Sequence, residues 1–258
     1  MIRSLACLAT VGMLLVLAAS VHADLILQLK PADYNESTGT WHDTSGNNND
    51  ATQATADARP ALVTGQTVNG SSVLRFDGWD YQALTSSITD NALTIFAYLR
   101  PVSGSLKAIV GGSSGDLEYR VYSTSTTLKQ ELIKQQVQRI ATGVTDLSVT
   151  SFSSISLAID KGENTYSFRL EGNSDGSGTS ALIETIGGIH YVGAALSAVE
   201  YFKGDIAEIR IYNTAMSDTE RSAVEAEFVA SYQAIPEPAS LSLLALGGLL
   251  LIRHRRKA

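Results

Sequence analysis

Apolar and polar positions alternate along short stretches of this chain, and a period of two predicts β-strands. The clearest stretch is Ile206–Tyr212, where β-branched residues dominate as they do in a strand that covers a core. Ser217 and Glu220 have the spacing of a capping box and predict the start of a helix. Val224 and Phe228 lie four residues apart on one face of that helix. This segment therefore predicts a closing strand and helix that pack against a folded sheet.

The same reading predicts further short strands, separated by turn-forming residues. They cover residues 24–30, 73–79, 81–84, 93–100, 107–110, 118–122, 136–140, 154–160, 165–170 and 189–193. Gly172–Ser180, rich in Gly and Ser, is expected to be a flexible surface loop. Many short strands with one closing helix predict a sandwich of two β-sheets.

The polar stretch Trp41–Ala51 allows two interpretations. Asn, Asp and Gly tolerate left-handed backbone conformations and bond their own backbone, so the stretch is typical of a structural turn. The oxygens of Asp43, Asn47 and Asp50 could instead converge on a cation. Because the ordered alternation and the closing glutamate of an EF-hand loop are missing, the structural turn is favoured.

The N-terminus has the features of a secretory signal peptide. Arg3 supplies a positive start, Leu5–Ala18 an apolar run, and small residues end at Ala23, after which we expect signal peptidase to cut. The only cysteine, Cys7, lies inside this peptide. The expected mature chain therefore has neither disulfides nor a thiol nucleophile, and its stability must come from a buried core.

The charge of the predicted body bears on its partners. Setting aside five basic residues and one acidic residue in the two ends, from totals of 19 and 26, leaves 14 basic and 25 acidic residues, a net charge of −11. Affinity for nucleic acid comes largely from Lys and Arg side chains that neutralise phosphates. Nucleic acid is therefore excluded as an expected partner.

Three stretches of the body resemble one known family. They are Asp43–Thr52 (DTSGNNNDAT), Leu74–Leu84 (LRFDGWDYQAL) and Gly204–Tyr232, and their order and spacing are similar to the laminin-G-like branch of the concanavalin A-like lectin and glucanase superfamily. The resemblance implies an all-β fold, a jelly-roll sandwich of two antiparallel sheets with a short C-terminal helix. It also implies that loops at one edge bind carbohydrate or protein partners, often with calcium.

The C-terminus resembles a PEP-CTERM sorting signal. The apolar stretch Leu241–Ile252 would span only about 18 Å as a helix, which is short for a membrane core of about 30 Å. The matching residues are Pro236, Glu237 and Pro238 before this stretch and Arg253, Arg255 and Arg256 after it. The resemblance implies that an exosortase removes the tail after a transient stay in the inner membrane, and that the body reaches the cell surface or the extracellular matrix. A plain single-pass anchor is the alternative.

The predicted organisation has three parts. Residues 1–23 are the signal peptide, 24–233 the β-sandwich and 234–258 the sorting signal with its hydrophobic helix and basic end.

Carboxylates suited to glycoside hydrolysis are missing from the pattern. That reaction needs two carboxyl groups about 5 to 10 Å apart on opposite sides of one bond. Asp205 and Glu208 differ by three positions and are expected on opposite faces of a strand, while Glu118 is not followed by a second carboxylate two or four residues further on. Glu225 and Glu227 are expected on the solvated face of the helix. The sequence therefore predicts a protein without catalytic residues.

Aromatic side chains beside polar loops favour a binding role, since a ring can cover the apolar face of a pyranose. Trp41, Trp79 and Tyr81 are the candidate sugar-binding residues, and Tyr201 adjoins a similar loop. For each of them, packing in the core is the competing interpretation. Asp77 and Asp80 could hold calcium beside Trp79, or could bond turn amides instead.

These observations lead to one hypothesis and two alternatives. The hypothesis is an exported, exosortase-sorted protein with a non-catalytic domain for carbohydrate, such as exopolysaccharide or other surface glycans. The first alternative is a structural or adhesion protein that contacts other proteins. The second is an unusual polysaccharide hydrolase.

Overall fold

The computed structural model describes residues 23–102, 107–113, 115–123, 127–134, 138–195 and 200–233. Residues 1–22 of the predicted signal peptide (1–23) lie outside these ranges. So does the whole predicted sorting tail from residue 234, with Pro236, Glu237, Pro238, Arg253, Arg255 and Arg256. Within the described ranges, no helix has the length and apolar character that crossing a membrane requires.

Strands dominate the described chain, as the alternating pattern predicts. The elements in order are β1 (Leu25–Asn35), β2 (Thr40–Asp43), β3 (Ala51–Thr52), a 3-10 turn (Ala56–Ala58), β4 (Ala61–Val63), β5 (Val73–Asp77), β6 (Gln82–Ile88), β7 (Ala92–Pro101), β8 (Lys107–Gly111), β9 (Leu117–Ser123), β10 (Leu128–Lys134), β11 (Gln138–Thr142), β12 (Ser153–Asp160), β13 (Thr165–Leu170), β14 (Asn173–Thr179), β15 (Ile189–Val192), β16 (Ala194–Ala195), β17 (Glu200–Tyr201), β18 (Lys203–Tyr212), α1 (Asp218–Phe228) and a π-helical turn (Val229–Gln233).

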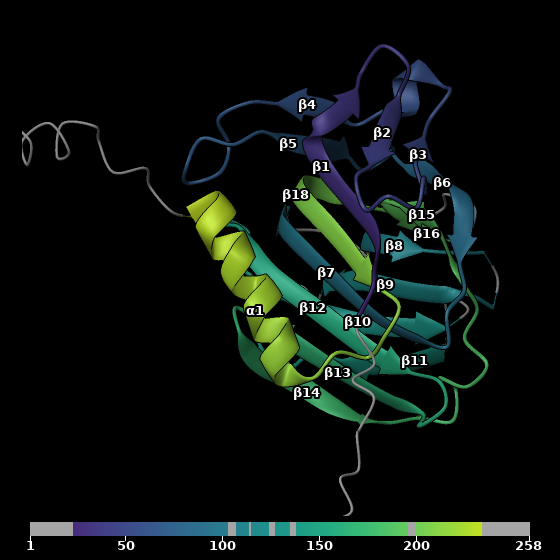
Figure 1. Ribbon diagram of the computed structural model, residues 1–258. Coiled ribbons are helices and arrows are strands. Elements are labelled where there is room, and N and C mark those ends of the chain that lie inside the picture. Colours follow the sequence, from purple (N-terminus) through teal and green to yellow (C-terminus); the bar gives the residue numbers. More distant parts are fainter. Residues whose placement is uncertain are drawn as a thin grey trace, which may run out of the picture.

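The strands pair antiparallel in the order β11-β10-β9-β8-β15-β6-β3-β2-β1-β18-β7-β12-β13-β14, with β5 also paired to β18. This long sheet folds back on itself (Figure 1). Strands β6, β8, β9, β10, β11 and β15 form what we call the first layer, and β1, β7, β12, β13, β14 and β18 form the second layer. The all-β prediction of two packed antiparallel layers, consistent with a jelly-roll sandwich, is confirmed.

The core lies between the layers because alternate residues of facing strands point inward. Leu117, Tyr119 and Val121 of β9 contribute from the first layer, and Leu157 of β12 and Ile209 of β18 contribute from the second. Each fully buried side chain of this size stabilises the fold by about 1.5–3 kcal/mol. The residues between them, such as Glu118 on β9, therefore lie on the outer faces.

Helix α1 covers the outer face of the second layer (Figure 1). Val224 and Phe228 pack there against Phe96 and Tyr98 of β7, with Tyr232 stacked on Tyr98 at a ring distance of 5.1 Å. The apolar stripe predicted from Val224 and Phe228 is confirmed. This second apolar cluster joins the C-terminal end of the described chain to the sheet.

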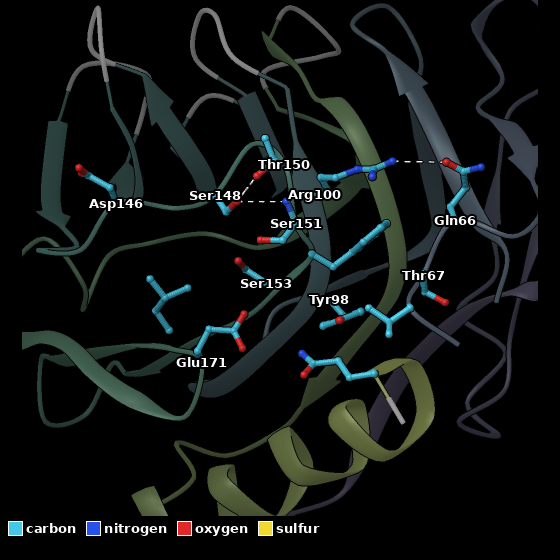
Figure 2. Close-up of a pocket in the computed structure, with 14 residues that line it drawn as sticks. Gln66, Thr67, Tyr98, Arg100, Asp146, Ser148, Thr150, Ser151, Ser153 and Glu171 are labelled. Carbon is cyan, nitrogen blue, oxygen red and sulfur yellow. Dashed lines mark hydrogen bonds between the residues drawn. The ribbon is translucent and has the colours of Figure 1, made fainter. Parts of the chain in front are cut away.

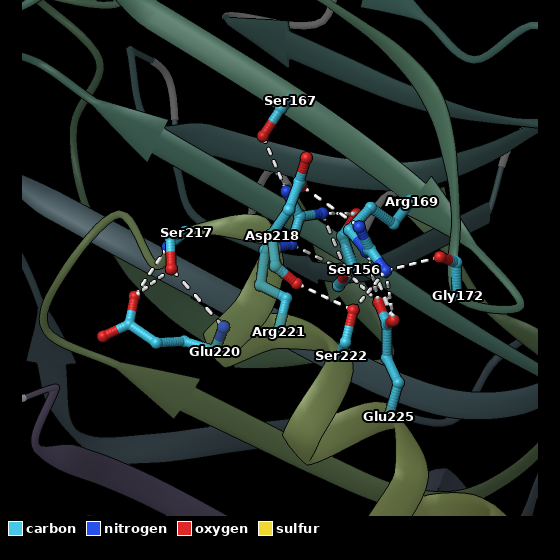
Figure 3. Close-up of polar contacts among 10 residues, drawn as sticks. All are labelled: Ser156, Ser167, Arg169, Gly172, Ser217, Asp218, Glu220, Arg221, Ser222 and Glu225. Atoms are coloured by element: carbon cyan, nitrogen blue, oxygen red, sulfur yellow. Dashed lines mark hydrogen bonds and ion pairs between the residues drawn. The ribbon is translucent and has the colours of Figure 1, made fainter.

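The predicted capping box begins this helix. The Ser217 hydroxyl accepts a hydrogen bond from the Glu220 amide, and the Glu220 carboxylate accepts from the Ser217 amide at 2.8 Å (Figure 3). Two amides that lack partners in the first turn are thus satisfied.

Ser217→Ala should lower the free energy of unfolding by about 1 kcal/mol, because it leaves the Glu220 amide without its acceptor. A urea unfolding curve measures this loss. Thr219→Ala, at an exposed position two residues further along, is the control and should show no loss. An equal effect of both substitutions would contradict the capping role.

A buried ionic network fixes α1 to the sheet. Glu225 accepts hydrogen bonds from Ser156 Oγ of β12 at 3.0 Å and from Arg169 Nε of β13 at 3.1 Å. Arg221 donates to the Ser156 carbonyl at 2.9 Å and to Ser167 Oγ at 2.6 Å (Figure 3). The expectation that Glu225 is solvated is wrong, since it is buried beside these cations. The exposed Glu227 agrees with its predicted place.

The predicted loop Gly172–Ser180 is also wrong, because residues 173–179 form β14 and pair along β13. The sequence of this strand is rich in Gly and Ser and has no apolar alternation, so periodicity cannot reveal it. Its partner strand decides its conformation by supplying a row of backbone hydrogen-bonding groups. Strand β10, paired with β9 and β11, is missing from the sequence prediction as well.

Candidate functional site

Four aromatic rings form a row, which we call the aromatic strip. Trp79 lies in the turn between β5 and β6, Tyr81 just before β6, Tyr191 in β15 and Tyr201 in β17. Ring centroids are 5.6 Å apart for Trp79 and Tyr201, 6.2 Å for Tyr201 and Tyr81, and 6.0 Å for Tyr81 and Tyr191. Trp79 is 71% exposed, which is unusual for so large an apolar side chain.

The turn before the strip explains why Trp79 points outward. Gly78 has a φ of +103°, a left-handed value that favours glycine. Asp77 Oδ1 accepts from the Trp79 amide at 2.8 Å, and Asp80 Oδ2 accepts from the Asp77 amide at 2.7 Å. Burial raises the pKa of Asp80 to about 6. Two carboxylates thus hold the tryptophan in its exposed position.

The carboxylates of Asp77 and Asp80 accept hydrogen bonds from backbone amides of the turn, as the alternative to a calcium site predicts. Within the described ranges, no three His, Cys, Asp or Glu side chains are grouped as a metal ion would need. A calcium ion between Asp77 and Asp80 therefore remains a prediction from the sequence.

Trp41, the third predicted sugar-binding residue, lies elsewhere. It is fully buried in β2, donates from Nε1 to the Lys30 carbonyl at 2.7 Å and packs edge-on against Tyr34. No face of its ring is available to a ligand, so the prediction is corrected in favour of core packing. Tyr191 belongs to the strip instead, although the sequence analysis did not select it. Only its outward position on β15 could have identified it.

The polar stretch after Trp41 satisfies itself. Asp43 accepts from the amides of Gln28, Ser45 and Asn49 at 2.9–3.0 Å, and Asp50 Oδ1 accepts from the Asp43 amide at 2.8 Å. Asn47 donates its side-chain amide to the Leu25 carbonyl at 3.0 Å, so it does not converge with them. The hydrogen bonds support the structural-turn interpretation of this loop.

A charged cluster lies on the outer face of the first layer. One of its members, Glu200, directly precedes Tyr201 of the aromatic strip in sequence. Arg120 Nη1 donates to Glu118 at 3.0 Å and to Glu200 at 2.8 Å, and its Nε donates to Glu131 at 2.7 Å. Arg139 pairs with Glu131 as well. Burial and the neighbouring Glu200 carboxylate raise the pKa of Glu118 to about 8. The spacing of residues along the sequence does not reveal this cluster, because its members come from four different strands.

The carboxylates on β18 also differ from expectation. Asp205 pairs across from Arg100 and Glu208 across from Tyr98, with a β-bulge between them. Arg100 and Tyr98 share one face of β7, so Asp205 and Glu208 share that face as well, which corrects their predicted opposite placement. Both carboxylates are bound to groups of the protein itself. Asp205 pairs with Arg75 Nε at 2.7 Å, and Glu208 accepts a hydrogen bond from the Tyr232 hydroxyl at 2.7 Å.

Two cavities lie on the outer face of the second layer and share Arg100 and Thr150. The larger has a volume of about 610 Å³, and hydroxyl groups of the loop before β12, among them Ser151, line one side of it (Figure 2). Arg100 lies over the Phe152 ring at 4.9 Å. The smaller cavity, of about 530 Å³, lies on the other side of Arg100 and is lined by Arg75 and Lys203.

Known proteins share this architecture. A family model described as the concanavalin A-like lectin/glucanases superfamily matches residues 76–220. None of the curated proteins matches the sequence.

Among solved structures, domain 4 of an extracellular arabinanase from Geobacillus stearothermophilus, in complex with arabinotriose, has a TM-score of 0.55 at 13% identity over 79% of this chain and 98% of that domain. An arabinofuranosidase complexed with arabinofuranosyl-α-1,2-xylobiose has a TM-score of 0.57 at 14% identity, covering 82% of this chain and 60% of that one. Botulinum neurotoxin type C, whose cell entry depends on two ganglioside molecules, has a TM-score of 0.56 at 10% identity, covering 79% and 51%. These likenesses show the fold.

Proposed function

The chain belongs to the concanavalin A-like lectin/glucanases superfamily, and on this basis we propose that it binds carbohydrate through the aromatic strip. The observation that carries the proposal is the 71% exposed Trp79 at the end of a row of three tyrosine rings. Such rings cover the apolar face of a sugar while their polar edges and neighbouring groups bond its hydroxyls. Two of the neighbours in fold were solved with bound oligosaccharides, which supports the ligand class.

We propose that the domain binds without catalysis. Glycoside hydrolysis needs a carboxylic acid that reaches the glycosidic oxygen. Glu118 and Glu131, which lie close together on the paired strands β9 and β10, are buried and bound to Arg120. Release of reducing ends from any glycan that the protein binds would overturn this part of the proposal.

Trp79→Ala should weaken glycan binding about 30-fold, since loss of an aromatic contact that dominates binding costs about 2 kcal/mol. The measurement is binding to an array of neutral and uronic acid oligosaccharides, followed by titration calorimetry with the bound probe. The melting temperature should stay unchanged because the side chain is exposed. Val144→Ala removes another well exposed apolar side chain and is the matched control.

If wild type binds no glycan on the array, the structural or adhesion role becomes the better account. If it binds but Trp79→Ala and Val144→Ala bind equally well, the binding site lies away from the strip.

For export, we propose cleavage after Ala23 and removal of the tail by an exosortase, which delivers the body to the cell surface or the matrix. The ordered motifs of the two ends in the sequence support this. Mass spectrometry of the exported protein should give a chain that starts at Asp24 and lacks Arg253, Arg255 and Arg256. A chain that keeps these residues would indicate an anchor instead.

A further inference from the structure

The smaller cavity beside Arg100 has an unusual lining, and we call it the cation notch. Arg75, Arg100 and Lys203 line it together with Val102 and Val149. The two valines are 44% and 43% exposed, so they place apolar surface in contact with solvent at the same point. An apolar wall with a few charged groups is the usual composition of a small-ligand site.

The charges of the notch are only partly compensated. Asp205, which is buried, accepts from Arg75 Nε at 2.7 Å and from Arg100, so one carboxylate serves two guanidinium groups. Lys203 is exposed and forms no ion pair within the described part of the chain. Asp77 also lines the cavity, but its Oδ1 holds the Trp79 amide. Three cations thus face two carboxylates: Asp205, which binds both guanidinium groups, and Asp77, which lies across from Lys203 in the pairing of β5 with β18. One positive charge is left over, on a body whose net charge is strongly negative.

The notch begins where the aromatic strip ends. A Cβ atom placed on Gly78, the residue before Trp79, would lie 3.6 Å from Cβ of Lys203, so the lysine stem lies against the tryptophan turn. Lys203 also follows Tyr201 of the strip by two residues. A ligand with a sugar ring on Trp79 would therefore have its next units within reach of these cations.

We propose that the cation notch binds the carboxylate of a uronic acid unit in the same polysaccharide whose neighbouring rings lie on the aromatic strip, a specificity that rests on the proposed function. Lys203 supplies an exposed ammonium donor, and hydrogen bonds between such a cation and a carboxylate are stronger than neutral ones. Val102 and Val149 contact the apolar face of the ring. On a body of net negative charge, this local cluster of cations is the place where the carboxylate of an acidic sugar is attracted.

The test uses an oligogalacturonate and the same oligomer after its carboxylates have been reduced to alcohols. Wild type should bind the acidic oligomer about tenfold more tightly at low salt, and the preference should fall as salt screens the exposed charge. Lys203→Gln should lose most of this preference and keep its affinity for the neutral oligomer. Lys203→Arg should retain the preference.

Lys129→Gln is the control for a general change in charge. It removes the same charge from β10, outside the lining of the notch. A loss of preference in Lys129→Gln equal to that in Lys203→Gln would overturn the assignment of the notch. Equal binding of both oligomers by wild type, with Trp79→Ala weakening both, would also overturn it while leaving the proposed function intact. Failure of wild type to bind either oligomer or any array glycan would overturn both proposals.

Discussion

Glu225→Ala should lower the free energy of unfolding by about 3–5 kcal/mol, the largest loss that we expect from any single substitution in α1. Glu225 accepts from both Arg169 and Ser156, and its charge also supports the nearby buried Arg221. Desolvation lowers the pKa of Arg221 to about 10, which shows how strongly burial disfavours this cation. Without Glu225, Arg169 would keep only the exposed Asp218 as a counter-ion. The buried Arg221 would lose the negative charge that most offsets its desolvation.

The measurement is urea unfolding at neutral pH, with fluorescence of the two tryptophans as the signal. Glu227→Ala is the matched control, since Glu227 lies on the same helix and pairs with Arg210 but 61% of its side chain is exposed. That variant should lose less than about 1 kcal/mol. Similar small losses in both variants would show that the buried network contributes little and that apolar packing alone fixes the helix.

Glu118→Gln should make the protein more stable at pH 8 by an amount of the order of a few kcal/mol, and leave it nearly unchanged at low pH. Glu118 and Glu200 both accept hydrogen bonds from Arg120 Nη1. Burial and the nearby Glu200 carboxylate raise the pKa of Glu118 from its usual value of 4.5 to about 8. A glutamine keeps the carbonyl acceptor for Arg120. It also supplies an N–H donor where the protonated acid would donate to Glu200.

The sign of this effect follows from proton linkage. Between pH 4.5 and 8 the folded chain holds a proton on Glu118 that the unfolded chain releases, so the stability of the wild type falls as pH rises through this range. The slope approaches about 1.4 kcal/mol per pH unit for one full proton. Asp80, with a pKa raised to about 6, adds a fall in the same direction that is mostly complete by pH 6.

Unfolding curves at pH 6, 7 and 8 isolate the contribution of Glu118. The wild type should lose stability across this interval, and Glu118→Gln should lose much less. Glu184→Gln, at an exposed position, should follow the wild type. If the wild type is equally stable at all three pH values, Glu118 does not hold its proton and the cluster around Arg120 is fully ionised.

Local patterns in the sequence were sufficient for several of these features. Ile206–Tyr212 forms a strand because its β-branched residues suit a half-buried pleated surface, and Ser217 with Glu220 caps α1 because the bonds involved span only three residues. The Asp77–Trp79 turn is visible for the same reason. Each depends on neighbours in sequence, which the sequence itself supplies.

Burial depended on partners that are distant in sequence. Trp41 and Trp79 look alike as aromatic residues beside polar loops, yet one is fully buried and the other mostly exposed. Asp205 and Glu208 share a face only because a bulge in β18 shifts the pairing with β7 by one residue.

The sequence by itself determined the class of the fold, the closing strand and helix, and the turn that carries Trp79, because each follows from periodicity or short-range hydrogen bonding. Only the tertiary structure decided which aromatic rings form the strip, which carboxylates meet around Arg120, and which cations line the notch beside Lys203. Arg120 and Glu200, for example, are 80 residues apart in sequence. They meet because the separate two-stranded sheet of β16 and β17 packs beside β8, the strand that pairs with β9.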